Sequence, residues 1–238
     1  VGEEIKRLAS AIGYGYDFID VQNGNSRINV KLKDFDGTEI NGMGPEIDGN
    51  ALNALMEKLR MLKEGDTLIL AGSIPASMPK SIYSDILKVL DGKGIDFVVD
   101  ATKELLLNVL QYHPFLIKPN NHELGELFGV KLEKKEQIEP YARKLQELGA
   151  RNVLVSMAGE GAVLLDESGN LHQLDAPKGK LVNAVGAGDS MVAGFLAGWI
   201  EQKDYLHAFK MAVCAGSASA FSEGYAKKEE IETLYHDL

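Results

Sequence analysis

The residues of this chain whose types and spacing best suit chemistry lie in the stretch Gly186-Ala187-Gly188-Asp189. Two glycines in so short a turn let successive backbone N–H groups converge on one point. An apolar run follows, and it predicts a helix from about Asp189 to Ile200 whose N-terminus adds a positive dipole end. Such a nest suits a phosphate, or the charge that develops on a phosphoryl group in transfer.

Asp189 itself has two interpretations that the spacing leaves open. An aspartate at the start of a helix often acts as its cap. A carboxylate beside an anion nest also repels the phosphate, and that cost makes sense where the carboxylate must accept a proton from an attacking hydroxyl group. The electrostatic argument favours a catalytic base over a cap.

The helix after the turn is expected to be buried, because apolar residues occupy all of its sides. Gly194 and Gly198, four residues apart, form a thin stripe that permits close approach of a second backbone. The alanine-rich helix expected from Ala208 to Phe221 is the predicted partner. A firmly packed helix that points its N-terminus at a ligand gives sound support to a site.

Short apolar runs separated by helical patterns predict an α/β fold with a mostly parallel central sheet flanked by helices. Apolar residues recur at helical spacing from Leu52 to Leu59, up to a break at Gly65. The runs expected to be central strands, covered on both faces, are Thr67 to Ala71, Phe97 to Asp100, Phe115 to Ile117 and Val153 to Val155.

Polar residues end or follow each of these four runs: Gly72-Ser73, Asp100-Ala101-Thr102, Lys118-Pro119-Asn120 and Ser156. Ligands of open α/β sheets bind outside the carboxyl ends of the strands, where all four clusters fall. Loops are polar in general, so one such cluster alone would mean little. The coincidence of four favours a binding site at this edge of the sheet.

The early part of the chain predicts a small separate sheet. Residues from Ser26 to Leu32 alternate between apolar and polar, which indicates a half-buried strand. Asp34 to Gly37 then has the composition of a turn, and Thr38 to Ile40 follows as a return strand.

Composition and missing motifs narrow the function. The formal net charge of −10 argues against a protein that binds nucleic acid or an anionic membrane, because both need a basic surface. The single cysteine, Cys214, is interpreted as core packing in a reduced, cytoplasmic compartment. The sequence contains no P-loop, dinucleotide fingerprint or hydrolase elbow, and its five histidines have no metal-site spacing.

Several motifs, in order along the chain, resemble those of the ribokinase-like carbohydrate kinases. Gly186 to Ser190 is similar to the C-terminal signature of that family, and its continuation to Gly194 is similar to the subgroup that acts on sugar phosphates. The segments Arg27 to Lys31 and Thr38 to Gly42 closely resemble kinases of fructose 1-phosphate. The other matches are to K-P-N-x-x-E, by Lys118-Pro119-Asn120-Asn121-His122-Glu123, and to G-S-x-P, by Gly72-Ser73-Ile74-Pro75.

The resemblance implies one ribokinase-like domain over residues 1–238 that uses ATP to convert fructose 1-phosphate to fructose 1,6-bisphosphate. Asp189 would be the general base, with Gly186, Ala187 and Gly188 as the anion hole for the γ-phosphate. Arg27 would bind the phosphate already on the sugar from a β-sheet lid within about residues 18–42, and Ser73 would contact the sugar. The lid sheet could also pair edge to edge in a homodimer.

The same resemblance implies a nucleotide and metal site. Lys118 and Asn120 would face the nucleotide phosphates. Glu123 would position Mg²⁺ through water, unless it is only a solvated carboxylate at a helix start. The residues expected beside the nucleotide are Ser156, Met157, Ala158, Gly159, Glu160 and Gly161, with Gly188 at its phosphates and Ser217 close to its adenosine end.

The chain departs from the family pattern in two places. Ala158 stands where the family commonly has the first glycine of S-x-G-x-x-G, so its methyl group could crowd the nucleotide. The family's first sheet strand, a substrate-binding aspartate and a Gly-Gly-Lys-Gly segment have no counterpart before residues 1–16. Because the chain starts at Val1 without Met, we expect it to begin inside a longer polypeptide. We expect these 238 residues alone to be inactive or misfolded, which activity of the purified chain would refute.

Three alternative functions stay open at this point. A kinase of tagatose 6-phosphate shares the motifs. A non-catalytic protein that binds a sugar phosphate or a nucleotide is less favoured, since a pure binder gains nothing from the repulsive carboxylate of Asp189. An oxidoreductase is disfavoured by the missing dinucleotide fingerprint.

Overall fold

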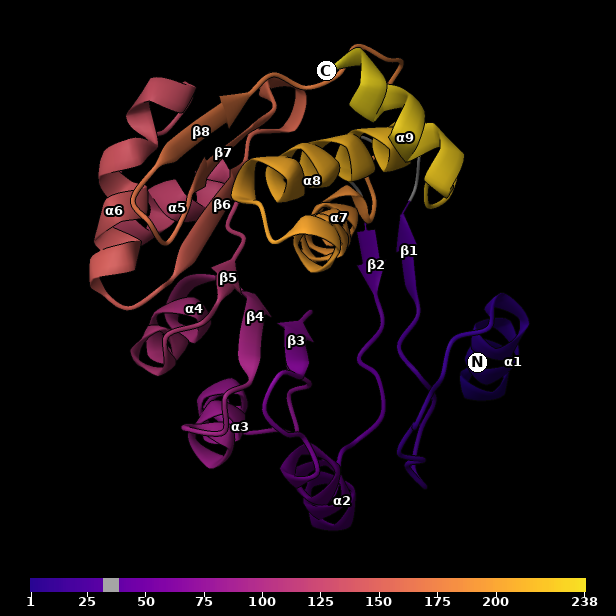
Figure 1. Cartoon of the computed structure of the whole chain (residues 1–238). Helices are drawn as coiled ribbons and strands as arrows, with labels where there is room; N and C mark the ends of the chain where they lie inside the picture. Colours follow the sequence, from indigo (N-terminus) through magenta and orange to yellow (C-terminus); the bar gives the residue numbers. More distant parts are fainter. Residues whose placement is uncertain (32–38) are drawn as a thin grey trace. The chain divides into compact units, whose positions relative to one another are not determined.

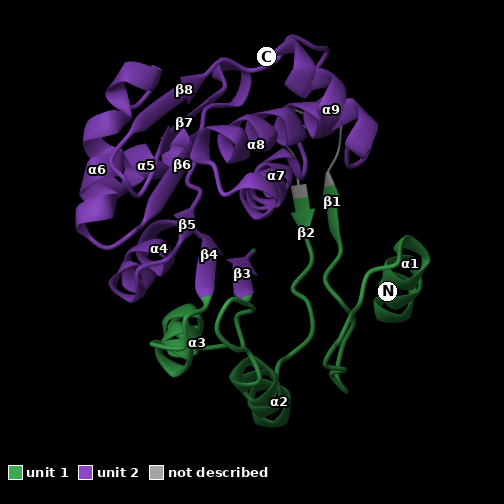
Figure 2. Ribbon diagram, viewed as in Figure 1, with its two compact units in different colours: residues 1–66, 72–95 green, residues 67–71, 96–238 purple. Residues whose placement is uncertain are grey.

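The computed structural model describes residues 1–31 and 39–238, and this part of the chain divides into two compact units (Figure 2). Unit 1 comprises Val1–Asp66 and Gly72–Ile95, and unit 2 comprises Thr67–Ala71 and Asp96–Leu238. The turn predicted from Asp34 to Gly37 lies outside the described residues, as do the adjoining ends of the two predicted strands, Leu32 and Thr38.

The described part of unit 1 contains α1 (Gly2–Ile12), β1 (Asn29–Lys31), β2 (Glu39–Asn41), α2 (Gly49–Arg60) and α3 (Ile82–Leu90) (Figure 1). Gly13 ends α1 in the left-handed conformation that glycine adopts at little cost. The side chain of Asp48 caps α2 by accepting a hydrogen bond from the Ala51 N–H. Local capping therefore sets the end of α1 and the start of α2.

The small sheet of unit 1 consists of β1 and β2, which pair antiparallel with Val30 opposite Ile40. This confirms that the region contains two strands, although the first begins at Asn29 and not at Ser26 as predicted. The prediction that their apolar face is half buried is wrong, because Val30 is 45% and Ile40 60% exposed. Among the described residues β1 and β2 pair only with each other, so no further strand helps to cover their faces.

Unit 2 is built on a sheet with the described strand order β3-β4-β5-β6-β7-β8. The strands are β3 (Thr67–Ala71), β4 (Asp96–Asp100), β5 (Leu116–Ile117), β6 (Asn152–Ser156), β7 (Ala162–Leu165) and β8 (Leu171–Leu174). β3 to β6 run parallel, which confirms the four predicted strands to within one residue. β7 and β8 extend the sheet antiparallel and were not predicted, so the sheet is mixed.

β3 forms one edge of the described sheet, and the prediction that it is covered on both faces is wrong. Ile69 within it is 48% exposed, whereas the middle of β4 and all of β5 are buried. An edge strand has a neighbour on one side only, so fewer side chains reach across it.

Helices cover both faces of the unit 2 sheet (Figure 1). On one face lie α4 (Lys103–Val109), α5 (Asn121–Phe128) and α6 (Glu139–Glu147), and α5 and α6 both pack on β6. On the other lie α7 (Ala187–Gln202) and α8 (Tyr205–Ala220), and α9 (Lys228–Asp237) packs on α8. Short 3₁₀ turns occur at Leu110–Tyr112 (η1), Lys135–Gln137 (η2) and Ala158–Glu160 (η3). A search of the described helices for one long and apolar enough to cross a membrane finds none.

α7 and α8 pack backbone to backbone along the predicted glycine stripe. A methyl group on Gly194 would lie 2.6 Å from the carbonyl oxygen of Met211 and 2.7 Å from the methyl group of Ala215. A methyl group on Gly198 would lie 2.9 Å from the Cα atom of Ala208. The stripe and its helical partner are thus confirmed, and neither glycine leaves room for a side chain.

Aromatic rings fill the C-terminal end of the same interface. Trp199, the only tryptophan of the chain, stacks on Tyr205 with the ring centroids 4.5 Å apart. Its ring also lies 5.4 Å, centroid to centroid, from that of Phe115, which precedes β5. Phe195 and Phe209 are completely buried in the core between the two helices and the sheet.

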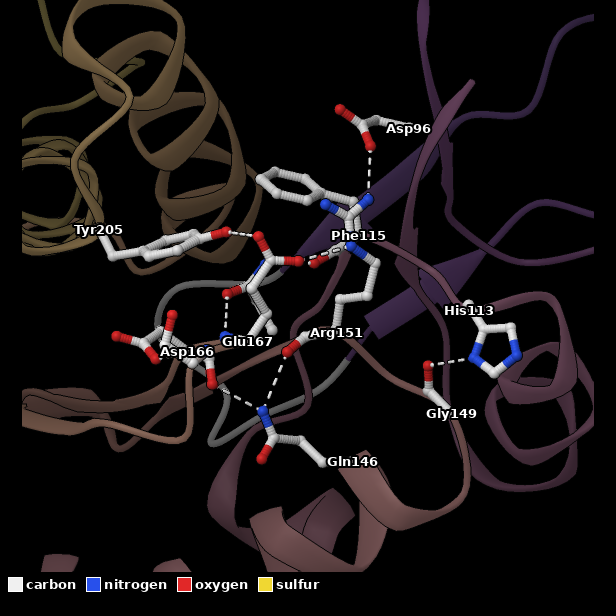
Figure 3. Close-up of polar contacts among 11 residues, drawn as sticks. Asp96, His113, Phe115, Gln146, Gly149, Arg151, Asp166, Glu167 and Tyr205 are labelled. Atoms are coloured by element: carbon white, nitrogen blue, oxygen red, sulfur yellow. Dashed lines mark hydrogen bonds and ion pairs between the residues drawn. The ribbon is translucent and has the colours of Figure 1, made fainter. Parts of the chain in front are cut away.

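A polar network at the amino ends of β4 and β6 ties these strands to α8 (Figure 3). The Arg151 guanidinium donates to Asp96 at 2.8 Å and to Glu167 at 2.7 Å. It also lies 4.9 Å from the centroid of the Phe115 ring, and the Tyr205 hydroxyl donates to Glu167. The network lies at the end of the sheet opposite the carboxyl ends of the parallel strands, away from the polar clusters predicted as a binding site.

Gly194→Ala tests the close packing of the helices. The added methyl group has to push α8 away, so we expect the free energy of unfolding to fall by about 1–3 kcal/mol and the melting temperature by about 2–10 °C. Gly49→Ala is the matched control, because a methyl group there meets nothing within 4 Å. Thermal unfolding followed by circular dichroism measures both, and equal melting of Gly194→Ala and wild type would contradict the packing.

Candidate active site

The turn predicted to bind an anion leads directly into α7. Gly186 is the N-cap residue, and its φ of 79° lies in the left-handed region that favours glycine. The ring of Tyr225 lies against it, since a methyl group on Gly186 would come within 2.6 Å of that ring. The Ser190 N–H donates to the Gly186 carbonyl oxygen at 2.9 Å and starts the helix. Conformation and space therefore both require glycine at position 186.

Backbone N–H groups at this turn are free to bind a ligand. Those of Gly186, Gly188 and Asp189 donate no hydrogen bond to any described residue. That of Ala187 is already engaged, since it donates to the Ala184 carbonyl oxygen at 3.3 Å. Because the helix dipole adds positive charge at the same place, the turn is suited to a phosphoryl group.

The side chain of Asp189 is exposed in the first turn of α7. Gly186 occupies the cap position, so the alternative interpretation of Asp189 as the helix cap is wrong. Among the described residues, no hydrogen bond or ion pair engages the carboxylate. The group is therefore available to accept a proton from a bound hydroxyl group.

Lys118 follows β5 directly and is only 6% exposed. Its ammonium nitrogen lies 3.2 Å from Oδ2 of Asp100, the last residue of β4. A methyl group on Gly188 would lie 3.1 Å from the same nitrogen. The lysine thus reaches the first turn of α7, where the free N–H groups are.

Acidic groups surround this ammonium group. Burial raises the pKa of the Asp100 carboxyl group above its ordinary value, and the adjacent Lys118 opposes the rise. The carboxylates of Glu123 and Asp189 raise it further, so they lie close enough to interact with Asp100 electrostatically. Carboxylates from β4, α5 and α7 therefore share one neighbourhood with Lys118.

Asn120 and Glu123 cap the start of α5 reciprocally. The Asn120 side-chain oxygen accepts from the Glu123 N–H, and the Glu123 carboxylate accepts from the Asn120 N–H, both at 2.8 Å. Glu123 is thus a structural cap as well as a half-buried carboxylate at a helix start. Its second oxygen and the Asn120 side-chain amide group hydrogen bond to no described residue and stay available to a ligand.

The predicted nucleotide loop begins where β6 ends. The Ser156 N–H donates to the Pro119 carbonyl oxygen at 3.2 Å, which joins this loop to the Lys118–Asn120 segment. Met157 is buried, whereas Ala158, Gly159 and Glu160 are exposed in η3. Ala158 has a φ of 48°, a conformation that costs an alanine about 1–2 kcal/mol relative to the right-handed region. The backbone therefore explains why glycine suits this position.

Two further nucleotide residues occupy constrained positions. A methyl group on Gly161 would lie 2.1 Å from the Leu174 carbonyl oxygen in β8, so only glycine fits there. Ser217 lies half-buried in the C-terminal half of α8, and its side chain hydrogen bonds to no described residue.

The predicted sugar-phosphate residues Arg27 and Ser73 lie together in unit 1. The Arg27 guanidinium donates to the hydroxyl group of Ser73, to Asn29 Oδ1 at 2.8 Å and to Asn41 Oδ1 at 3.4 Å. Its described partners are neutral, so its positive charge is not cancelled by a carboxylate among them. An exposed guanidinium held in this way is suited to a phosphate.

Two residues near the candidate site, Asp100 and Tyr225, were not predicted as site residues. Asp100 was noticed only as a polar strand end, although its place beside Lys118 on the neighbouring strand could have revealed the pair. Tyr225 is 72% exposed and contacts Gly186 from the segment after α8. No pattern in the sequence connects it with that glycine.

Comparison with known proteins follows the same lines. A model described as pfkB family carbohydrate kinase matches residues 1–232. The chain is 46% identical over 237 residues to the 1-phosphofructokinase of Bacillus subtilis (strain 168), which covers 100% of this chain and 78% of that enzyme. It is 33% identical over 217 residues to the D-tagatose-1-phosphate kinase of Bacillus licheniformis, which covers 91% of this chain and 71% of that enzyme.

Solved structures agree in fold. A Staphylococcus aureus protein, described provisionally as a phosphofructokinase in its crystal structure, is 38% identical with a TM-score of 0.88 over 99% of this chain and 76% of its own. The motifs, the sheet with its carboxyl-edge site and the family match over residues 1–232 lead to one conclusion. The chain belongs to the pfkB family of carbohydrate kinases, with the ribokinase-like α/β fold.

Proposed function

We propose that the protein transfers the γ-phosphoryl group of ATP to the 6-hydroxyl group of fructose 1-phosphate, giving fructose 1,6-bisphosphate and ADP. The observation that carries this proposal is the 46% identity, over the whole chain, to the Bacillus subtilis 1-phosphofructokinase. Membership of a kinase family supports ATP as the phosphoryl donor. An assay of the full-length protein with ATP and fructose 1-phosphate, coupled to ADP formation, tests it directly.

In this reaction Asp189 accepts the proton of the 6-hydroxyl group of the sugar. At the same time the oxygen of that hydroxyl group bonds to the γ-phosphorus of ATP. The bond between that phosphorus and the β–γ bridging oxygen breaks, and ADP leaves. The free N–H groups of the α7 turn and the Lys118 ammonium stabilise the negative charge on the transferring group. Asn120, the loop from Ser156 to Gly161 and Ser217 would hold the rest of the nucleotide.

The donor groups fit Mg²⁺ bound through water. Among the described residues, no three His, Cys, Asp or Glu side chains come together as a metal cage. Mg²⁺ commonly keeps several waters and uses one or two carboxylates together with substrate phosphates. The free oxygen of Glu123 would serve such an ion, which when bound would neutralise phosphate charge. Its other oxygen stays with the Asn120 N–H, so water-mediated contact preserves the cap of α5.

D-tagatose 1-phosphate is a second candidate substrate, favoured by the 33% identity to the Bacillus licheniformis kinase. Both sugars carry their phosphate on carbon 1 and a free hydroxyl group on carbon 6, and they differ in configuration at carbon 4. The ratio of kcat/KM for the two sugars decides between them. Fructose 6-phosphate and tagatose 6-phosphate belong in the same assay, since the motifs alone do not exclude the latter.

Asp189→Asn tests the general base. The amide cannot take the hydroxyl proton, so we expect kcat to fall by about 10²- to 10⁴-fold. Removing the negative charge leaves the anion nest intact, so calorimetry should show ATP and sugar-phosphate binding at least as tight as in wild type. Asp237→Asn, an exposed aspartate at the end of α9, is the matched control with unchanged kcat. Unimpaired turnover by Asp189→Asn would rule out the base.

Arg27→Ala tests the phosphate contact of the lid. Loss of a charge-assisted hydrogen bond costs about 1.5–3 kcal/mol, so we expect KM for fructose 1-phosphate to rise by about 10- to 150-fold. KM for ATP should not change, and activity toward unphosphorylated fructose should be unaffected. Arg60→Ala removes an exposed arginine of α2 and serves as control. An equal loss with fructose and fructose 1-phosphate would show that Arg27 does not bind the phosphate.

A homodimer through the lid sheet is the proposed assembly. The exposed apolar side chains of Val30 and Ile40 in β1 and β2 support it, because burial in a partner would remove them from water. We expect sedimentation equilibrium to give a dimer and the double variant Val30→Glu/Ile40→Glu to give a monomer. A wild-type monomer at micromolar concentration, or a dimer that survives the double substitution, would contradict the lid interface.

A further inference from the structure

We propose that Asp100 is a positioning residue for the phosphoryl transfer, which holds the Lys118 ammonium at the first turn of α7 and away from Asp189. The inference rests on the proposed function and assigns a role in it to a residue that otherwise has none. Asp100 touches neither substrate nor reacting atoms in this proposal, and it acts through Lys118.

The sheet brings the two residues together. β4 and β5 run parallel with Val98 beside Leu116 and Val99 beside Ile117, so the next positions along the two strands are Asp100 and Lys118. The ammonium nitrogen lies 3.2 Å from Asp100 Oδ2. Backbone hydrogen bonds of the sheet therefore fix the carboxylate to which the lysine is tied.

The same nitrogen is placed for chemistry. It lies 3.1 Å from the position of a methyl group on Gly188, next to N–H groups that have no described partner. Lys118 is only 6% exposed, so water cannot replace a lost partner of its ammonium group. The position of that group is therefore set by the neighbouring protein groups. A small displacement of a group that binds the phosphoryl group during transfer greatly lowers the rate of the reaction.

Other carboxylates near Lys118 could pair with it, and this explains why Asp100 must hold the ammonium group in place. Asp100 lies in contact with the ammonium group, and two further carboxylates, those of Glu123 in α5 and Asp189 in α7, are close enough to act on Asp100 electrostatically. A buried ammonium group is stabilised by an ion pair with a carboxylate. Among the described residues, only Asp100 forms such a pair with Lys118. With Asp100 removed, Asp189 and Glu123 are the remaining acidic groups near it. A pair between Lys118 and Asp189 would occupy the base and draw the cation away from the phosphoryl group.

The experiment is a double-mutant cycle on the full-length protein with Asp100→Asn, Lys118→Met and the two combined. We expect Asp100→Asn to lower kcat by about 10- to 100-fold, with KM for the sugar phosphate nearly unchanged. Because Asp100 acts through Lys118, the double variant should turn over within about twofold of Lys118→Met alone.

Asp96→Asn is the matched control. Asp96 lies at the amino end of the same strand and also forms an ion pair, with Arg151 at 2.8 Å. Its loss should lower the melting temperature and leave kcat unchanged. If Asp100 is merely structural, Asp100→Asn will resemble this control, which would overturn the proposal. Kinetic losses that multiply in the double variant would overturn it too.

Failure of the proposed function has a different signature. The proposed function is refuted if the wild-type protein phosphorylates no ketohexose phosphate. In that case the same variants are compared by their ATP affinity, measured by calorimetry. Non-additive losses of ATP affinity in the two single variants support the tether, since both then act on one ammonium group. Additive losses, or no loss in Asp100→Asn, contradict it.

Discussion

The backbone contact between α7 and α8 is the constraint on which the rest of the structure depends. Gly194 and Gly198 let the two helices meet without side chains between them, so α7 has little freedom to slide or tilt. The contact continues to the start of the helix, where a methyl group on Gly216 would lie 3.2 Å from the Ala187 carbonyl oxygen. The Ser219 hydroxyl donates to the Ser190 hydroxyl at 2.8 Å in the same region. The direction of the Gly186–Asp189 turn is therefore set by the core.

The candidate site at the carboxyl ends of the parallel strands combines positive and negative groups. The chain has a net charge of −10, yet its candidate phosphoryl site uses backbone N–H groups and one buried lysine rather than a basic surface. Asp100 pairs with that lysine, and the carboxylates of Glu123 and Asp189 are close enough to act on Asp100 electrostatically. Negative groups therefore lie beside the positive ones at this candidate site, and their repulsion acts on any bare anion that approaches it.

Sequence patterns predicted what depends on local order along the chain. The strands β3 to β6, the helix after Gly188 and its glycine stripe all follow from apolar periodicity, and the structure confirms them. The prediction that this helix is buried on all sides is wrong, because Ala193, Ala197 and Ile200 are exposed along one face of it. Features set by distant neighbours were not predictable in this way. The exposure of Ile69 depends on its being at a sheet edge, and β8 reads Leu-His-Gln-Leu, which has no strand pattern. The Asp100–Lys118 pair and the contact of Tyr225 with Gly186 exist only once strands and helices have assembled.

The position of Trp199 has an optical consequence. It is the only indole in the chain, it lies at the opposite end of α7 from Asp189, and it stacks on Tyr205 with the Lys203 ammonium 5.1 Å from its ring. Under excitation that the eight tyrosines do not absorb, its emission therefore reports on the contact between α7 and α8. A shift in wavelength or quenching would follow the parting of these helices, whereas events confined to the nucleotide loop would leave the emission unchanged. Trp199 is thus an intrinsic fluorescent probe of the packing between α7 and α8.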